Sequence, residues 1–355
     1  MEDYVMKVAI VGTGAVGGFV GGAAADAGED ITLIDPWDQN VEAIRSNGIL
    51  VDDPVAGPRH FHPRKVISIN EIGTLQASFD LLLVAVKSYN TEMAVTKMIP
   101  YLTEDSTVVS VQNSINEEVI MPIVGRSRTV GVVVRGNCQM MQPAKILITR
   151  SITQSDNTGV GGVNYLVGEL DGKITKRAER IAQVLSHANK ATVTSNLWGE
   201  RWSKLIINCV ANSVCGATGL RSSEVWTNPA LRKVSSQLAY ETVDVGNRLG
   251  YPIPSVMGDL SVDDILGVPK GESVKLDQAL LQRSQKVHEL AMPSLLQDIL
   301  KERRTEIDYL NGLVVNKGKE AGVATETSQA IVSLIHAIEQ GQAKPNPDAV
   351  AQLAI

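Results

Sequence analysis

Residues 7–35 read KVAIVGTGAVGGFVGGAAADAGEDITLID, and this stretch decides the fold of the N-terminal half. Residues 7–11 form a short, mainly apolar run, which is typical of a parallel strand covered on both faces. The Ala- and Gly-rich run 15–27 predicts a tightly packed helix, and residues 31–34 predict a second strand. A GxGxxG motif lies between the first strand and the helix, at Gly12, Gly14 and Gly17.

Each glycine of the motif has its own use in a dinucleotide-binding fold. Gly12 permits the tight turn, Gly14 lets the backbone approach a pyrophosphate, and Gly17 lets helix and strand pack closely. The phosphates would lie at the electropositive N-terminus of the helix. A tight turn without a ligand is the alternative, but the strand before and the helix after the motif favour a dinucleotide site.

Asp35 ends the second strand, where an acidic side chain accepts hydrogen bonds from ribose hydroxyls. NADP enzymes usually carry a basic residue here, but Arg45 is the first Lys or Arg after Asp35. We therefore expect NAD(P)H as cofactor, with NADH favoured over NADPH because Asp35 would repel the 2′-phosphate. The alternative is that Asp35 only caps the next helix, with Pro36 at the first helical position.

Apolar runs and helical stretches alternate up to about residue 150. This alternation predicts an α/β fold, a doubly wound parallel sheet of the Rossmann type. Its further buried strands are predicted at 81–86 and 107–111, with a helix around 91–99 between them. We expect three more strands, at 129–134, 145–149 and 163–167, to extend this sheet in an antiparallel or mixed arrangement.

Lys87 and Asn113 follow the two predicted strands 81–86 and 107–111. Ligands of open α/β sheets bind at the carboxyl ends of the strands. A lysine there can meet phosphate, ribose or carboxylate, and an asparagine offers both a donor and an acceptor. We therefore predict that both residues bind the cofactor, although either could be an ordinary surface residue.

The length of 355 residues exceeds what one compact core usually holds, which is roughly 100–200 residues. Strand signals almost vanish after Ser195. We expect a dinucleotide-binding domain of residues 1–195 and an all-helical substrate and catalytic domain of residues 196–355. Leftover apolar helix faces suggest a homodimer.

The composition restricts the partners and the compartment. The formal net charge of −6 argues against nucleic acid or an anionic membrane as a partner. The chain shows neither a signal peptide nor an apolar run near the roughly 18 residues of a membrane span, so we expect a cytoplasmic protein. No metal is expected, since Cys138, Cys209 and Cys215 lack metal-binding spacing, and we interpret His60 and His62 as part of a solvated hairpin.

Lys204, Asn208 and Asn212 recur every four residues within a largely apolar segment, so a helix would carry them on one face. An unpaired amide in such a setting costs on the order of 1–3 kcal/mol. A bound oxo acid would supply the missing partners, which makes the row a candidate substrate site. Hydrogen bonds between helices, or ordered water, are the alternative.

Ser294, Asp298, Glu302 and Glu306 form a second row spaced by four. We interpret part of this row as a solvated helix face with i,i+4 ion pairs to nearby basic residues. Ser294 and Glu306, at the two ends, are the members that could reach inward.

Five segments together resemble the ketopantoate reductase (2-dehydropantoate 2-reductase) family, in order and over residues 7–322. They are GTGAVGG (12–18), VAVKSYNT (84–91), VQNS (111–114), WSKLIINCVANSV (202–214) and SLLQDILKERRTEIDYLNG (294–312). The resemblance implies a Rossmann-type domain that binds NADPH, and a helical domain like that of 6-phosphogluconate dehydrogenase that closes over a small 2-oxo acid.

The resemblance also implies roles for individual residues. The catalytic lysine of the family falls on Lys204, which would protonate the alkoxide as hydride reaches the C2 carbonyl. Glu306 would orient or tune this lysine. The residues that hold the substrate fall on Asn208, Asn212 and Ser294, and those of the cofactor cleft fall on Lys87 and Asn113.

The expected activity is reduction of 2-dehydropantoate to pantoate, in pantothenate biosynthesis. The sequence departs from the family at several points: Asp35 in place of a nearby basic residue, Ser114 for the usual glycine, Ala291 for a polar residue, residues 324–326 for Pro-Thr-Pro, and a long segment 255–290. The alternatives are an NAD-dependent dehydrogenase or reductase of another 2-oxo or 2-hydroxy acid, and a non-catalytic dinucleotide-binding sensor.

Overall fold

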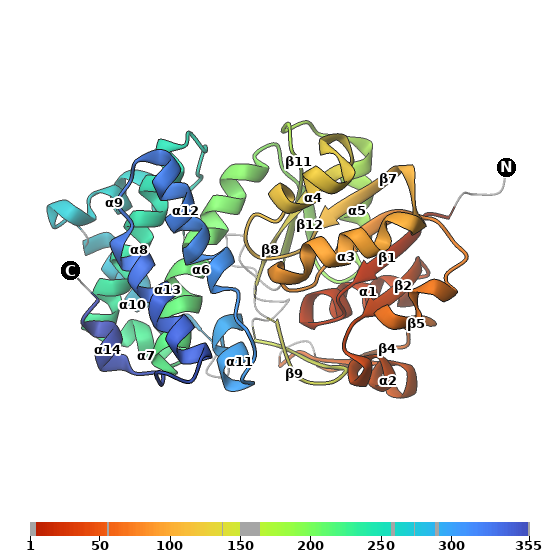
Figure 1. Cartoon of the computed structure of the whole chain (residues 1–355), viewed down its shortest axis with the longest axis horizontal. Coiled ribbons are helices and arrows are strands. Elements are labelled where there is room, and N and C mark those ends of the chain that lie inside the picture. The colour runs from red at the N-terminus through yellow and green to blue at the C-terminus, as the bar shows by residue number, and fades with distance from the viewer. Residues whose placement is uncertain are drawn as a thin grey trace. The chain divides into compact units, whose positions relative to one another are not determined.

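The computed structural model describes residues 5–54, 57–136, 138–149, 164–256, 260–272, 274–287 and 291–353. The chain divides into two compact units, Met1–Leu197 and Trp198–Ile355, which run from red to green and from green to blue in Figure 1. The first unit combines sheets with helices, and the second consists of helices. The predicted fold class, a doubly wound α/β unit followed by a helical one, is confirmed.

An eight-stranded sheet forms the centre of the first unit, in the order β12-β11-β8-β7-β6-β1-β2-β5. In this order, the six neighbouring strands β8, β7, β6, β1, β2 and β5 run parallel to one another. Strand β11 is antiparallel to β8, and β12 is parallel to β11. The strands are β1 (Lys7–Val11), β2 (Asp30–Asp35), β5 (Lys65–Ser68), β6 (Phe79–Val84), β7 (Leu102–Ser110), β8 (Thr129–Arg135), β11 (Asn164–Glu169) and β12 (Ala191–Val193). The strand order reverses between β1 and β6, where doubly wound sheets bind ligands.

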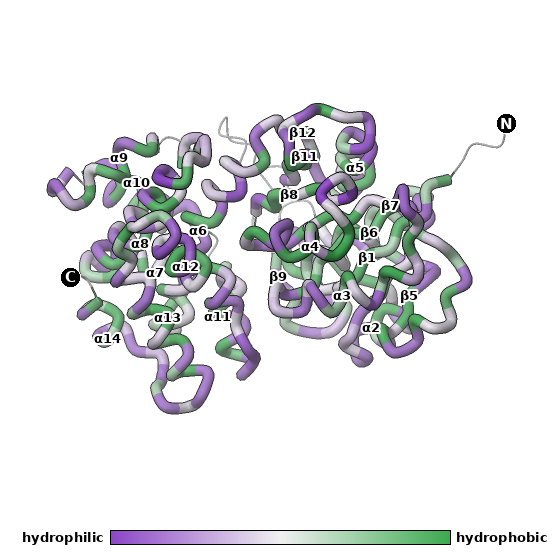
Figure 2. The backbone as a smooth tube through the Cα atoms, turned by 45° about the horizontal axis from the view of Figure 1, so that its top comes forward, coloured by the Kyte–Doolittle hydropathy of each residue, from purple (hydrophilic) through white to green (hydrophobic). Residues whose placement is uncertain are grey.

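Both faces of this sheet are covered, so its strands are apolar on both sides. Val8 and Ile10 of β1 belong to one core, whereas Ala9 and Val11 belong to a second core on the other face. The first core includes α1 (Ala15–Asp26), α2 (Asp38–Asn47) and α5 (Lys176–Ser186), and the second includes α3 (Thr91–Met98) and α4 (Glu117–Val124). In Figure 2, β1 and β6 accordingly run through hydrophobic stretches.

A second, four-stranded sheet has the order β4-β3-β10-β9 and packs against α1. Its strands are β3 (Ile49–Asp52), β4 (Arg59–Phe61), β9 (Cys138–Gln142) and β10 (Lys145–Ile148). Strand β10 pairs with β3 and β9, so the expectation that residues 145–149 extend the large sheet is wrong. The strand expected at 163–167 is β11, although residue 163 lies outside the described residues.

Helix α1 lies between the two sheets, and its glycines make this possible. A Cβ on Gly21 would lie 2.3 Å from a Leu33 side-chain carbon on β2, whereas a Cβ on Gly22 would come within 3.0 Å of Phe61 on β4. The run 17–24 is buried without interruption. The Ala- and Gly-rich composition of α1 therefore reflects close packing on two sides.

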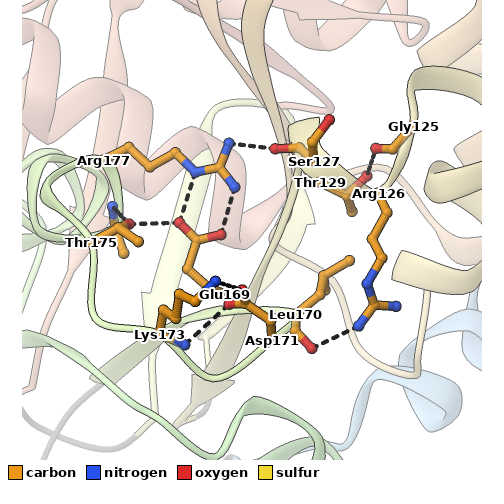
Figure 3. Close-up of polar contacts among 11 residues, drawn as sticks. Gly125, Arg126, Ser127, Thr129, Glu169, Leu170, Asp171, Lys173, Thr175 and Arg177 are labelled. Carbon is orange, nitrogen blue, oxygen red and sulfur yellow. Dashed lines mark hydrogen bonds and ion pairs between the residues drawn. The ribbon is translucent and has the colours of Figure 1, made fainter.

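A group of ion pairs holds α5 to the end of β11 (Figure 3). Arg177 donates to both carboxylate oxygens of Glu169, at 2.7 and 2.6 Å, and to the carbonyl of Ser127. The Thr175 hydroxyl also donates to Glu169, whose side chain is only 4% exposed. Burial alone would raise the pKa of Glu169, but the hydrogen bonds from Arg177 and Thr175 outweigh it, so the net pKa is lowered.

Arg177→Leu should lower the free energy of unfolding by about 2 kcal/mol at pH 7, because the substitution leaves a buried carboxylate without its charged donor. A lowered carboxyl pKa stabilises the fold above the unfolded value, near 4.5, and this contribution disappears as the pH falls through the folded value. The loss in the variant should therefore shrink below about pH 4.5.

Urea unfolding at pH 7 and at pH 4 would measure this loss. Lys173→Leu is the matched control, because Lys173 pairs with Asp171 on the same turn but both side chains are exposed. It should cost much less than Arg177→Leu, because water screens an exposed ion pair. Equal losses in the two variants, or a loss independent of pH, would contradict the assignment.

The second unit is built around α8 (Pro229–Arg248), which packs against α7, α9, α10, α12, α13 and α14. The other helices are α6 (Leu197–Thr218), α7 (Ser222–Thr227), α9 (Val262–Leu266), α10 (Val274–Lys286), α11 (Ser294–Leu300), α12 (Asn311–Ala321), α13 (Glu326–Glu339) and α14 (Pro347–Ala351). Among the described residues of either unit, no helix is long and apolar enough to cross a membrane.

Candidate active site

The glycine motif forms the turn between β1 and α1, at the reversal point of the large sheet. Gly12 has a φ of +98°, and a Cβ on it would lie 2.6 Å from the backbone of Ala85 and Val86. Gly17 is equally constrained, since its Cβ would lie 1.9 Å from the Gly12 carbonyl oxygen. Both positions therefore require glycine so that the β1–α1 loop can lie against the segment that follows β6.

Gly14 differs from the other two glycines. A Cβ on Gly14 would meet no atom within 4 Å, so the packing of the described residues does not demand glycine there. Gly14 is the N-cap of α1 and offers no side-chain cap, and the first turn of α1, which is fully described, contains no acidic residue. The amide donors in the first turn of α1, and the positive end of the helix dipole, fit a pyrophosphate that approaches the backbone closely.

Asp35 is buried at the end of β2, directly beside the glycine loop. Its carboxylate accepts hydrogen bonds from the Thr13 amide, from the Thr13 hydroxyl at 2.7 Å and from the Trp37 amide at 2.8 Å. Helix α2 begins only at Asp38, with Trp37 as its N-cap. The alternative that Asp35 caps this helix, with Pro36 at the first helical position, is therefore wrong.

Arg45 is held away from the glycine loop by acidic neighbours. It donates to Glu42 at 2.7 Å, to Glu71 at 2.5 Å and to the carbonyl of Val66 at 2.9 Å. The hydrogen bonds that Arg45 donates to Glu71 and Glu42 raise its pKa. The first basic residue after Asp35 thus has its charge largely compensated within α2 and the segment after β5.

Lys87 and Asn113 lie in the loops that follow β6 and β7, and both are half-buried. A buried polar network joins these loops. Gln112 donates to the Val86 carbonyl at 2.7 Å and to the Thr91 hydroxyl at 2.8 Å, and Asn116 donates to the Ser88 hydroxyl and to the Asn113 carbonyl. Neither Gln112 nor Asn116 was predicted from the sequence as a site residue, although both follow closely after an apolar run that ends at a ligand-binding edge.

Ser114, which takes the place of the family's glycine, has a φ of +71° and is buried. This left-handed conformation costs a non-glycine residue on the order of 1 kcal/mol. The departure from glycine therefore puts a residue with a side chain into a left-handed conformation, at the expense of backbone strain.

Ser114→Gly should be more stable than Ser114→Ala by about 1 kcal/mol, because both variants lose the hydroxyl but only glycine relieves the strain. Thermal unfolding of the two variants side by side measures this difference. Equal melting temperatures, or a more stable alanine variant, would mean that position 114 carries no strain.

On α6, Lys204, Asn208 and Asn212 lie on one face, as predicted from their spacing. Lys204 is half-buried, whereas Asn208 and Asn212 are only 4% and 6% exposed. The side-chain nitrogen of Asn208 is buried and has no hydrogen-bond partner. The alternative that helix–helix hydrogen bonds satisfy the row does not hold for this amide, which needs an acceptor from a ligand or water.

Ser294 lies on an element that contacts α6, whereas Glu306 lies shortly before one. Ser294 begins α11, which packs so closely on α6 that a Cβ on Gly216 would lie 2.0 Å from Leu295. Glu306 is buried and precedes the 3-10 turn Ile307–Tyr309, just before α12.

The expected second row, however, does not form one helix face. Helix α11 ends at Leu300, and Glu302 has a φ of +53°. Asp298, which was interpreted as part of a solvated face, is buried. The spacing of four is therefore coincidental across this turn.

Asn311, the first residue of α12, is another polar residue that was not predicted from the sequence. Asn311 is fully buried, and its amide nitrogen donates to the Cys209 carbonyl on α6 at 3.5 Å. Its side-chain oxygen has no partner. The α6–α12 contact thus places a second incompletely satisfied amide close to the polar row.

The cysteines and the His60–His62 pair were considered as metal ligands because of their residue types. Cys138, Cys209 and Cys215 are reduced thiols, and burial raises the pKa of both Cys209 and Cys215 to about 12. The His60 and His62 rings meet edge to face with centroids 5.4 Å apart. Within the described part of the chain, no group of three or more His, Cys, Asp or Glu side chains is arranged to hold a metal ion.

Comparison with known proteins places the chain in one family. The family model described as ketopantoate reductase PanE/ApbA matches residues 8–161, and its C-terminal counterpart matches residues 196–339. The chain belongs to the ketopantoate reductase family. The resemblance stated from the sequence is thus confirmed, and the chain is an oxidoreductase of this family.

Curated relatives match over nearly the whole length. The 2-dehydropantoate 2-reductase of Archaeoglobus fulgidus is 25% identical over 95% of this chain and 99% of its own. That of Pyrococcus horikoshii is 26% identical over 94% and 98%.

Solved structures share the fold. A PanE/ApbA family ketopantoate reductase from Ralstonia eutropha is 25% identical, with a TM-score of 0.74 over 95% of this chain and 99% of that one. A D-mandelate dehydrogenase, solved with NADH and anilino(oxo)acetate, is 22% identical, with a TM-score of 0.77 over 95% and 99%.

Proposed function

We propose that this chain reduces a 2-oxo acid to the 2-hydroxy acid with NAD(P)H, and that 2-dehydropantoate is the substrate, giving pantoate. The observation that carries the proposal is the row on α6, where a half-buried lysine precedes two buried asparagines, one with an unpartnered amide nitrogen. The names of the archaeal relatives support the choice of substrate. Residues 1–195 would bind the dinucleotide, and residues 196–355 would hold the substrate.

The residues of this chain provide what the reaction needs besides hydride. When bound, NAD(P)H supplies hydride to the C2 carbonyl carbon. Lys204 donates the proton that the carbonyl oxygen takes up, and its charge stabilises the developing alkoxide. The amides of Asn208 and Asn212 and the Ser294 hydroxyl hold the carboxylate and hydroxyl of the substrate. Glu306 acts as a positioning residue for Lys204.

Lys204→Ala should lower kcat by roughly 10²–10⁴-fold, which is the usual contribution of a positioned general acid. The dissociation constant for NADH should change little, since the glycine motif belongs to the other unit. Steady-state kinetics and NADH fluorescence titration measure the two quantities.

Lys233→Ala, which removes an exposed lysine on α8, is the matched control and should behave like the wild type. Near-wild-type turnover in Lys204→Ala would refute the general-acid role. It would also support the alternative that the protein only senses the dinucleotide. Membership of a reductase family argues against this alternative.

Another 2-oxo acid is the second candidate substrate. Ala291, where a polar residue is common in the family, is 2% exposed in the segment just before α11, so this buried position is apolar in this chain. The solved D-mandelate dehydrogenase shares the fold, and its structure contains anilino(oxo)acetate, which carries an aromatic ring. A kcat/KM screen of 2-dehydropantoate against aliphatic and aromatic 2-oxo acids decides between the two.

For the cofactor we propose a preference for NADH over NADPH. Asp35 places a buried carboxylate at the end of β2, and the charge of Arg45 is compensated by Glu42 and Glu71. The Asp35 carboxylate would repel the 2′-phosphate of NADPH, and the segment after β2 offers no uncompensated basic side chain to bind that phosphate.

The wild type should favour NADH by about 30-fold in kcat/KM, equivalent to about 2 kcal/mol. Pro36→Arg should move the ratio towards NADPH by about 10-fold or more, because Pro36 is exposed beside Asp35 and an arginine there can bind the phosphate. Pro36→Ala controls for the loss of proline. A wild type that prefers NADPH would contradict the proposal.

We further propose that the protein is a homodimer. A ketopantoate reductase from Staphylococcus aureus, which shares the fold with a TM-score of 0.69 and 18% identity, is described as dimeric. Light scattering that returned the 38.1 kDa monomer mass at micromolar concentration would refute the dimer.

A further inference from the structure

Thr13 is the one residue with a side chain between the first two glycines of the motif, and it is fully buried. Its amide and hydroxyl both donate to the Asp35 carboxylate. Its carbonyl and hydroxyl oxygens both accept from the side-chain nitrogen of Asn40, at 3.0 and 2.9 Å. The loop is therefore held at this single residue from two sides.

Asn40 links the loop to the second sheet. It lies in the first turn of α2 and is fully buried. Its side-chain oxygen accepts from the amide of Ala144 at 2.8 Å. Ala144 lies in the turn between β9 and β10, has a φ of +56° and is buried. One carboxamide thus joins the glycine loop to a turn that lies 104 residues after Asn40 in sequence.

We propose that Asn40 is a positioning residue for the dinucleotide: it holds Thr13 so that Gly14 and the N-terminus of α1 are preorganised for the phosphates. This inference rests on the proposed function. A glycine-rich loop loses more conformational freedom on ordering than any other backbone. A loop ordered before the ligand arrives does not have to be ordered during binding, so the complex is tighter.

The role is one of position and not of contact. Both ends of the Asn40 carboxamide are used by the protein, the nitrogen by Thr13 and the oxygen by Ala144. Loss of Asn40 should therefore weaken dinucleotide binding without altering the chemical step. The same argument applies to the Thr13 hydroxyl, which serine retains and valine lacks.

The test compares two pairs of variants of the full-length protein. In the first pair, Asn40→Ala removes the link, and Asn47→Ala removes an exposed amide at the end of the same helix. In the second pair, Thr13→Val removes the hydroxyl and Thr13→Ser keeps it. The measurements are the NADH dissociation constant by fluorescence, kcat at saturating NADH, KM for the 2-oxo acid, and thermal unfolding.

Asn40→Ala and Thr13→Val should weaken NADH binding by about 10-fold, which is about 1.4 kcal/mol. Their kcat at saturating NADH and their KM for the 2-oxo acid should stay within about 2-fold of the wild type. Asn47→Ala and Thr13→Ser should bind NADH like the wild type. If Asn40 and the Thr13 hydroxyl only stabilised the fold, their loss would lower the melting temperature, and the NADH dissociation constant would not change independently of kcat.

Unchanged NADH affinity in a folded Asn40→Ala, or equal affinities of Thr13→Val and Thr13→Ser, would overturn the inference. If Asn40→Ala does not fold, the Thr13 pair decides alone. A wild type that binds neither NADH nor NADPH would instead refute the proposed function, so the two failures are distinguishable.

Discussion

The approach of two backbones at the reversal point of the large sheet is the contact on which the first unit depends. Gly12 lies so close to Ala85 and Val86 that a side chain would overlap them, and Gly17 lies as close to the Gly12 carbonyl. These contacts place the N-terminus of α1 at the carboxyl ends of β1 and β6. Gly14 makes no such contact, and the absence of a side chain there suits a ligand.

The parallel sheet could be predicted because its signals are local. Apolar runs, the glycine motif and the intervening helical stretches all lie within short windows of sequence. The second sheet could not be predicted in the same way, because its strands are short and their partners come from distant segments. The strand at 145–148 was recognised as a strand, but periodicity does not reveal which strand it pairs with.

The candidate site shows the same limit. The row on α6 could be recognised because the spacing of a single helix determines it. Glu306 could not be placed by spacing, since the chain leaves the helix at Leu300, and only the family resemblance assigned it a role. Asn40 and Gln112 were missed because a lone polar residue resembles a surface residue until its buried partners, far away in sequence, are known.

The second sheet also has a consequence for the order of events during synthesis. Its strands β3 and β4 leave the ribosome early, but β10, which pairs with β3, ends only at residue 148. Until then only the β3–β4 half of the sheet that covers one side of α1 is present, and Asn40 lacks the Ala144 amide. Pairing over such a separation forms late, because loop closure has to precede it. A nascent chain can therefore hold the complete glycine motif well before it has a finished phosphate-binding loop.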